Sequence, residues 1–251
     1  MRILAFYSYK GGTGKTTSAG NIGYNLSAEG KRVLLIDMDP QCNLTYLYGK
    51  VNRLGSNIYT LFKDGKSISS CIRRTRFPQI DMVYGSIKLD ELDVGDPEIL
   101  KRALQEVANN YDYVIIDCHP AFDWKTINSL AAANDLIVTF KPDQFGLNGL
   151  ELVKNRVRKC RSIDINYNNL EKIRILVTMA ANRKSQLTTL FKLFEDEPWQ
   201  HFETAISYSE AVNSAMEMKK PLLKHRAKAT ATKDYCAVTK EYAGEDNNYE
   251  C

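Results

Sequence analysis

The chain has 251 residues, a formal net charge of +4, 44% hydrophobic residues and 25% charged residues, which is ordinary for a soluble globular protein that can bury a full core. The slight positive charge permits an anionic partner without requiring one. Six cysteines are scattered without C-x-x-C pairs, so a disulfide framework or a zinc cluster is disfavoured. No stretch approaches the roughly 18 apolar residues of a membrane span, and no apolar signal segment begins the chain. We therefore expect a cytoplasmic protein with reduced thiols.

Short apolar runs rich in β-branched residues alternate along the chain with helical patterns. The predicted strands are residues 3–8, 32–37, 81–85, 113–117, 135–140, 173–179 and 201–206. The predicted helices are residues 14–29, 97–109, 124–133, 146–161, 184–196, 209–218 and 230–243. Because strands that are apolar throughout are buried on both faces, the pattern predicts an α/β fold with a doubly wound, mostly parallel sheet flanked by helices. We expect a single domain over residues 1–243, small helices and loops within residues 42–80, and a frayed polar tail at residues 244–251.

The first predicted strand leads into a glycine-rich sequence, YKGGTGKTT at residues 9–17, and then into a predicted helix. Its glycines allow backbone N–H groups to wrap a phosphate, and the helix N-terminus adds partial positive charge. Lys15 can reach the β and γ phosphates of a nucleotide, and Thr16 can place its hydroxyl on Mg²⁺. The alternative is a glycine-rich turn that only caps the helix. We expect ATP and Mg²⁺ to bind here, with ATP contacted by Lys10, Gly11, Gly12, Thr13, Gly14, Lys15, Thr16 and Thr17.

This loop departs from the common pattern G-x-x-x-x-G-K-[ST], because Tyr9 stands where the first glycine is expected. The sequence KGGTGKT at residues 10–16 resembles the deviant Walker A motif of the ParA/MinD family of P-loop ATPases, in which that glycine is often replaced. The resemblance implies that Lys10 reaches across a homodimer interface to the phosphates of the nucleotide in the other subunit. A lysine acting in this way would make dimerisation depend on ATP. The alternative is a solvated Lys10 at the loop edge, and the sequence does not explain why an aromatic residue precedes it.

The second predicted strand ends in the sequence DMDPQ at residues 37–41. Carboxylates at the C-terminal end of a buried parallel strand face the ligand crevice, and the alternation of a strand places Asp37 and Asp39 on the same side. One carboxylate can orient a water molecule, and the other can hold metal-bound waters or pair with a lysine. The alternative is a pair of strand-end caps. The motif resembles the family's first switch, which implies that Asp39 assists hydrolysis beside Lys10 and Lys15 and that Asp37 supports the metal.

The fourth predicted strand ends in Asp117, which gives a carboxylate carried by a buried strand. This is the arrangement of a Walker B acid, which is aimed at the water shell of a metal, so we expect Thr16, Asp37 and Asp117 on the metal side of the site. The family usually continues D-x-P-P, whereas His119 stands here in place of a proline. We interpret His119 as a tolerated loop substitution, because phosphoryl transfer needs no imidazole. Cys118 has no evident partner cysteine, which argues against an iron–sulfur cluster.

The resemblance extends less specifically through the distal half of the chain. Residues 126–150 resemble the family's stretch from the second switch to the next strand and helix, and residues 176–187 resemble the strand end near the adenine. Three residues of the latter are candidate neighbours of the base: Met179, Asn182 and Arg183. The family often has I-P-x-S/N farther on, whereas here Ser207 and Tyr208 follow Ile206, so the base contacts differ in detail.

A basic stretch, KKPLLKHRAKATATK at residues 219–233, follows this region. Such a stretch can contact phosphates without reading a base sequence. In the partition ATPases that the chain resembles, this region contributes to non-specific DNA binding. We expect five of its residues to contact DNA: Lys219, Lys220, Lys224, Arg226 and Lys228. The alternative is a solvated basic face.

Together, these motifs resemble the short, Soj-like form of the ParA family. The resemblance implies an ATPase that forms a homodimer with ATP, binds DNA non-specifically and drives plasmid or chromosome partition at the nucleoid. It also implies a ParB-like, centromere-binding partner that stimulates hydrolysis. The C-terminal sequence lacks a strongly apolar amphipathic face, so membrane binding is disfavoured. The alternatives are a MinD-like regulator or positioner that acts on a membrane or a non-DNA cargo, and an inactive nucleotide-binding scaffold.

Overall fold

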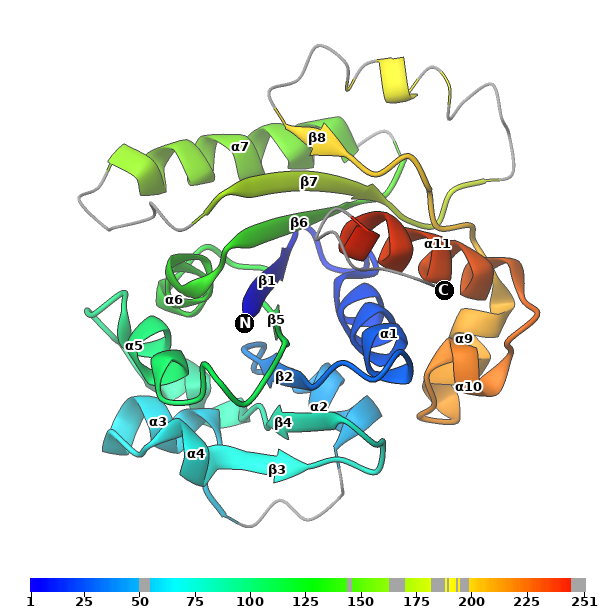
Figure 1. The fold of residues 1–251 in the computed structure, drawn as a ribbon. Coiled ribbons are helices and arrows are strands. Elements are labelled where there is room, and N and C mark those ends of the chain that lie inside the picture. The colour runs from blue at the N-terminus through cyan, green and yellow to red at the C-terminus, as the bar shows by residue number, and fades with distance from the viewer. Residues whose placement is uncertain are drawn as a thin grey trace.

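The computed structural model describes residues 1–49, 55–143, 146–162, 170–181, 188, 190–192, 194 and 199–244. These residues form an eight-stranded sheet with the order β3-β4-β2-β5-β1-β6-β7-β8 (Figure 1). The strands are β1 (Arg2–Tyr7), β2 (Val33–Asp37), β3 (Ile72–Arg74), β4 (Ile80–Val83), β5 (Tyr113–Asp117), β6 (Asp135–Phe140), β7 (Lys172–Val177) and β8 (Gln200–His201). Strand β3 is antiparallel to β4, and the other described pairs are parallel. The predicted fold class, a doubly wound and mostly parallel sheet, is therefore confirmed.

The central strands are apolar throughout because both of their faces are covered. All five residues of β2 and of β5 are buried. Along β2, Val33 and Leu35 belong to one core cluster, whereas Leu34 and Ile36 belong to the other. Successive side chains of a strand point to opposite faces, so the two clusters lie on opposite faces of the sheet.

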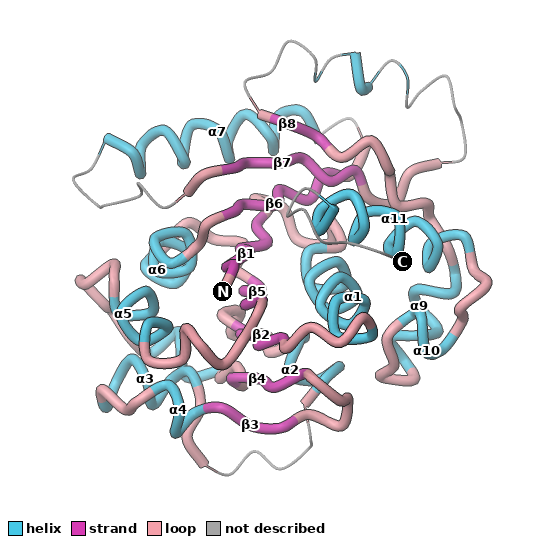
Figure 2. The backbone as a smooth tube through the Cα atoms, viewed as in Figure 1, coloured by secondary structure: helices cyan, strands magenta, loops and turns pink. Residues whose placement is uncertain are grey.

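Helices cover both faces of the sheet (Figures 1 and 2). They are α1 (Lys15–Ala28), α2 (Asn43–Tyr48), α3 (Ile58–Asp64), α4 (Ile68–Cys71), α5 (Ile99–Gln105), α6 (Trp124–Ala132), α7 (Gly146–Ser162), α9 (Glu210–Glu217), α10 (Leu222–His225) and α11 (Thr230–Gly244), with a 3₁₀ helix η1 (Ile87–Glu91). Ile22 of α1 and Val238 of α11 share one core cluster. Leu100 of α5, Leu130 of α6 and Val153 of α7 share the other. Among the described helices, none combines the length and apolar character needed to cross a membrane.

The strand register brings the ends of the three central strands to one edge of the sheet. Phe6 of β1 is in register with Asp117 of β5, and Asp117 is in register with Asp37 of β2. The loop that leaves β1 therefore lies beside the carboxylates that end β2 and β5. This edge is the crevice in which open α/β sheets bind ligands.

Two details of the predicted secondary structure are wrong. The strand expected at residues 201–206 ends at His201. The N–H groups of Phe202 and Ile206 still donate to carbonyls of β7, but that of Thr204, which lies between them, donates together with that of Glu203 to the carboxylate of Glu241 in α11. The stretch predicted as small helices and loops contains α2, α3 and α4 but also the edge strand β3, which is three residues long. The predicted helix at residues 184–196 and the predicted tail lie mostly outside the described residues.

Candidate functional site

The loop between β1 and α1 has the conformation of a phosphate cradle. Gly12 and Gly14 have φ angles of 74° and 79°, in the left-handed region that favours glycine. A Cβ atom built on Gly11 or Gly12 would meet nothing within 4 Å, so the loop borders open space there. Helix α1 begins at Lys15 and directs its first N–H groups toward this space. The loop amides and the helix N-terminus together form a site that suits an anion.

Hydroxyl groups hold the loop against the sheet. The Thr13 hydroxyl lies 2.6 Å from that of Ser8 and 2.9 Å from that of Thr139, while the Thr178 hydroxyl donates to the Thr13 carbonyl at 2.7 Å. The Thr13 side chain is buried, so it braces the loop from behind instead of pointing into the cradle. Sequence reasoning missed Thr178, whose only signal is a hydroxyl residue near the end of the strand predicted at residues 173–179.

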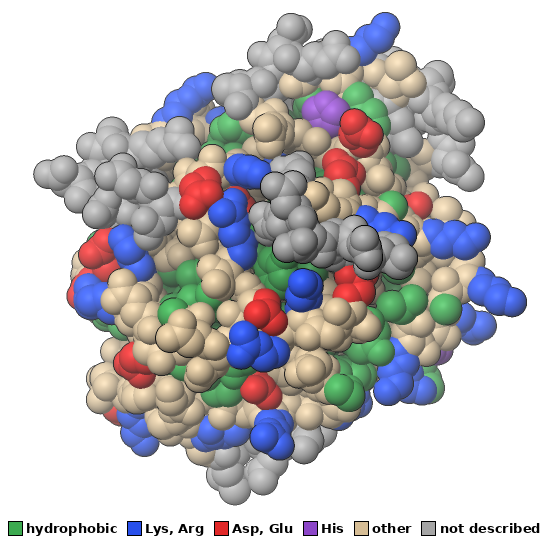
Figure 3. Space-filling view, in the orientation of Figure 1, with side chains coloured by type: hydrophobic (Ala, Val, Ile, Leu, Met, Phe, Trp, Pro, Cys, Tyr) green, Lys and Arg blue, Asp and Glu red, His purple; other side chains and the backbone are tan. Residues whose placement is uncertain are grey.

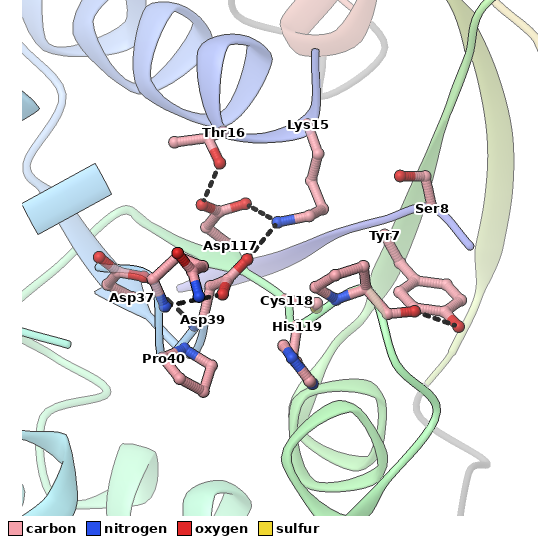
Figure 4. Close-up of polar contacts among 12 residues, drawn as sticks. Tyr7, Ser8, Lys15, Thr16, Asp37, Asp39, Pro40, Asp117, Cys118 and His119 are labelled. Atoms are coloured by element: carbon pink, nitrogen blue, oxygen red, sulfur yellow. Dashed lines mark hydrogen bonds and ion pairs between the residues drawn. The ribbon is translucent and has the colours of Figure 1, made fainter. Parts of the chain in front are cut away.

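Beneath the loop, the structure brings together four predicted site residues (Figure 4). The Lys15 Nζ atom lies 2.7 Å from Asp117 Oδ1 and 3.6 Å from Asp39 Oδ2. The Thr16 hydroxyl donates to Asp117 Oδ2 at 2.7 Å. Lys15, Asp39 and Asp117 are each less than a tenth exposed. A buried ammonium thus holds two carboxylates that arrive from different strands.

Burial controls the ionisation of this cluster. Burial lowers the pKa of Lys15, but the carboxylates of Asp117 and Asp39 raise it by more than burial lowers it. The pKa therefore lies above its usual value, and the ammonium stays charged. Burial raises the pKa of Asp117, and Lys15 and Thr16 offset only part of that rise. Burial and the neighbouring Asp117 raise the pKa of Asp37 to about 7. The buried cluster therefore contains more carboxyl groups than ammonium groups. Their oxygen atoms are ligands that suit a hard cation such as Mg²⁺.

Asp37 and Asp39 have different roles in the turn after β2. Asp37 Oδ2 accepts from the backbone N–H and the hydroxyl of Thr45 at 2.8 and 2.7 Å, and Asp37 Oδ1 accepts from the Asp39 N–H at 3.2 Å. Asp39 Oδ1 accepts from the Gln41 N–H at 3.0 Å, which leaves Oδ2 as the oxygen that faces Lys15. Asp37 thus organises the turn that presents Asp39.

Lys10 and His119 lie near the site but contact groups other than the Lys15 ammonium. Lys10 lies at the outer edge of the loop, where its Nζ atom is 3.2 Å from Asp143 Oδ2 in the same chain. Its side chain is 48% exposed, so its predicted role across a dimer interface stays a prediction. His119 Nδ1 lies 3.1 Å from Asp123 Oδ2, and Asp123 caps α6. Burial raises the pKa of the adjacent Cys118 thiol to about 12.

A pocket opens beside the start of α1, where Met179 lies together with Gly14 and Thr17. Met179 has a φ angle of 53°, an uncommon conformation for a residue other than glycine that is often found at functional sites. Residues 206–209 form another part of the wall, together with residues of α9 and α11, and Tyr208 is 61% exposed. In the sequence, Tyr208 stands out only as a departure from the family pattern. Two further predicted base neighbours, Asn182 and Arg183, lie outside the described residues.

The predicted DNA-contacting residues lie in one segment, from the end of α9 through α10 to Lys228. They are called the basic surface below: Lys219, Lys220, Lys224, Arg226 and Lys228. Lysine and arginine side chains gather at this side of the molecule, around α9 and α10 (Figure 3). The Lys219 ammonium lies 3.6 Å from the centre of the Tyr46 ring, and the Lys224 ammonium lies 5.4 Å from that of Phe77. Arg76, which sequence reasoning missed, also lies over Phe77, at 5.1 Å. The aromatic rings therefore hold cations from distant segments on one face.

Comparison with known proteins gives a consistent result. Residues 1–171 match a family model described as an AAA domain. The chain is 31% identical to the sporulation initiation inhibitor protein Soj of Bacillus subtilis, over 96% of this chain and 98% of that protein. It is 29% identical to the chromosome partitioning protein ParA of Caulobacter vibrioides, over 96% and 93% of the two chains. Among solved structures, it is similar to a putative plasmid partition protein from Borrelia burgdorferi bound to AMPPNP, with a TM-score of 0.79, 26% identity and coverage of 97% and 99%.

Proposed function

The chain belongs to the ParA/Soj family of partition ATPases, and on this basis we propose that it hydrolyses ATP in a cycle of dimerisation and DNA binding that positions a plasmid or chromosome. One arrangement carries the proposal: Lys15 and Thr16 meet Asp117 at 2.7 Å directly beneath an open glycine loop. The same arrangement fits a nucleoside triphosphate, because the loop supplies N–H donors and Lys15 supplies a mobile positive charge. The similarity to a partition protein bound to AMPPNP supports an adenine nucleotide.

Each residue of the cluster receives a role in ATP binding. The N–H groups of residues 11–17 bind the phosphates, and Lys15 exchanges its carboxylate partners for the β and γ phosphates. Thr16 and Asp117 stand on the Mg²⁺ side, with Asp37 behind Asp117 in the adjacent strand. Bound Mg²⁺ neutralises charge on the β and γ phosphates. Met179 and the pocket around it take the base.

Asp39 is proposed to orient the attacking water. Its Oδ1 atom is fixed by the Gln41 N–H, while Oδ2 is held only at 3.6 Å from Lys15. When Lys15 turns to the phosphates, Oδ2 becomes available to accept a hydrogen bond from water. The fixed Oδ1 atom limits how far the carboxylate can rotate.

Lys10 is proposed to complete the site of a second subunit, and the basic surface is proposed to bind DNA phosphates in the dimer. A lysine that is nearly half exposed at the loop edge can reach a neighbouring chain. Four cations of the basic surface are exposed, namely Lys220, Lys224, Arg226 and Lys228. A ParB-like partner that binds a centromere site is proposed to stimulate hydrolysis at the nucleoid.

The experiment measures self-association and DNA binding in the same samples. Sedimentation with ADP, AMPPNP and ATP should give a dimer only with the triphosphates, and Lys10→Ala should bind nucleotide as a monomer but dimerise weakly. The ATP-bound dimer should bind random-sequence DNA, and its affinity should fall steeply with salt. A chain that stays monomeric with AMPPNP, or that pellets with liposomes and ignores DNA, would contradict the proposal.

A further inference from the structure

Arg156 of α7 contacts three aromatic residues in and around the phosphate loop. Its guanidinium carbon lies 4.3 Å from the centre of the Tyr9 ring and 5.3 Å from that of Phe122. Its Nη1 atom donates to the Tyr7 hydroxyl at 2.8 Å. Tyr7 ends β1, Tyr9 begins the loop, and Phe122 lies in the segment between Asp117 and α6. One half-buried cation therefore contacts the segments on both sides of the site.

The Tyr7 hydroxyl extends this connection. It accepts from Arg156 and donates to the carbonyl of Pro120 at 3.3 Å. A phenol can do both only while it is protonated, and burial raises the pKa of Tyr7 to about 12. At neutral pH, Tyr7 therefore links α7 to the loop that follows Asp117.

Tyr9 differs from Tyr7 in being 42% exposed. Its ring lies against Arg156, and its neighbour is Lys10, whose carbonyl accepts from the Ser8 hydroxyl at 3.0 Å. Tyr9 and Lys10 also line a small pocket together with Leu150 of α7. The ring thus anchors the short segment that carries Lys10 to α7, in addition to the hydroxyl groups that bond the Lys10 carbonyl.

We propose that Arg156 is a positioning residue for ATP-dependent dimerisation: it holds the Tyr9 ring, and thereby the backbone that presents Lys10 to a second subunit. This inference rests on the proposed function. It explains an aromatic residue at position 9, because only a flat ring offers a face to the guanidinium. A glycine or a small residue there would leave the Lys10 segment without this contact.

The test compares Arg156→Ala, Arg156→Lys, Tyr9→Leu and Tyr9→Phe with the wild-type chain. Dimerisation with AMPPNP is followed by sedimentation, nucleotide affinity by a fluorescent ATP analogue at monomer concentrations, and folding by thermal denaturation. We expect Arg156→Ala and Tyr9→Leu each to weaken dimerisation about 10-fold with monomer nucleotide affinity unchanged. Tyr9→Phe, which keeps the ring, should behave as wild type, and Arg156→Lys, which keeps the charge, should recover part of the loss. Arg158→Ala is the matched control, since Arg158 lies on the same helix, is exposed and donates to Asn155, three residues before it on α7.

The double variant separates positioning from simple packing. If Arg156 acts through Tyr9, then combining Arg156→Ala with Tyr9→Leu should weaken the dimer little more than either change alone. If the losses of dimer affinity from the two changes multiply, or if Arg156→Ala leaves the dimer unaffected, the inference is overturned and the proposed function stays intact. Should Arg156→Ala not fold, Tyr9→Leu and Arg156→Lys decide the question by the same readouts. A wild-type chain that never dimerises with AMPPNP would reject both this inference and the proposed function.

Discussion

Asp117→Asn should destabilise the nucleotide-free protein by about 3 kcal/mol. The substitution keeps the shape of the side chain but removes the charge that lies 2.7 Å from the buried Lys15 ammonium. Breaking a buried ion pair on one side costs about 3–5 kcal/mol, because the remaining charge stays buried. The lower end applies here, since Asp39 still faces Lys15 at 3.6 Å and the substitution also removes the charge that repels Asp37 and that burial disfavours. Urea denaturation at pH 7.5 without nucleotide measures the change in the free energy of unfolding.

The control is Asp112→Asn at the opposite end of the same strand. Asp112 pairs with Arg32 at 3.0 Å, but the two side chains are 37% and 50% exposed. Exposed pairs contribute about 0–1 kcal/mol, so Asp112→Asn should change the free energy of unfolding by no more than that. ATP should stabilise the Asp117→Asn chain in EDTA, because Lys15 and the loop remain, but added Mg²⁺ should give little further stabilisation. Equal effects of the two substitutions would refute the assignment of a buried charge cluster to this site.

Three further outcomes follow from the described contacts. Asp39→Asn should keep ATP binding and dimerisation while single-turnover hydrolysis falls about 10²- to 10⁴-fold, the usual contribution of a general base; unchanged hydrolysis would remove the role given to Asp39. Lys224→Ala should reduce the slope of log affinity for DNA against log salt concentration by about 0.9. The control Lys66→Ala, at an exposed position between α3 and α4, should leave this slope unchanged. The Cys118 thiol, fully buried and with its pKa raised to about 12, should resist iodoacetamide at pH 8 until the chain unfolds, while the partly exposed Cys42 reacts first, as peptide mass mapping would show.

The predicted parts of the site are those whose geometry follows from strand ends. Asp39 and Asp117 could be placed together because they follow or end apolar strands, and parallel strands end at one edge of a sheet; Lys15 joined them through the glycine-rich motif that follows the first strand. The sequence did not reveal that Asp37 would accept three hydrogen bonds from Thr45 and the Asp39 backbone. The set of donors that Asp37 accepts from depends on the fold of the turn, which no periodic pattern encodes.

Contacts between distant segments were not predictable in the same way. Arg156 lies on a helix whose pattern is merely amphipathic, 147 residues from Tyr9, and nothing local distinguishes it from Arg158. Likewise, Arg76 lies beside the basic surface because it shares the Phe77 ring with Lys224 and donates to the Lys219 carbonyl, both contacts between distant segments. The strand predicted at residues 201–206 was wrong for a related reason, since Glu241 of a later helix accepts from the N–H groups of Glu203 and Thr204, a contact between distant segments that no local pattern shows.

The contacts of Lys15 with Asp117 and Asp39 are the ones that a bound nucleotide would have to replace. Lys15 is the one ammonium within reach of both Asp117 and Asp39 in the described cluster, and its pKa is raised because it is shared between them. A phosphate that draws Lys15 away leaves these two carboxylates without that charge, in a site where burial already raises the pKa of Asp117. The same movement therefore frees Asp39 for water and leaves Asp117 and Thr16 as hard oxygen donors for a divalent cation. Triphosphate binding and metal binding should consequently strengthen each other, because the displacement of one ammonium prepares both.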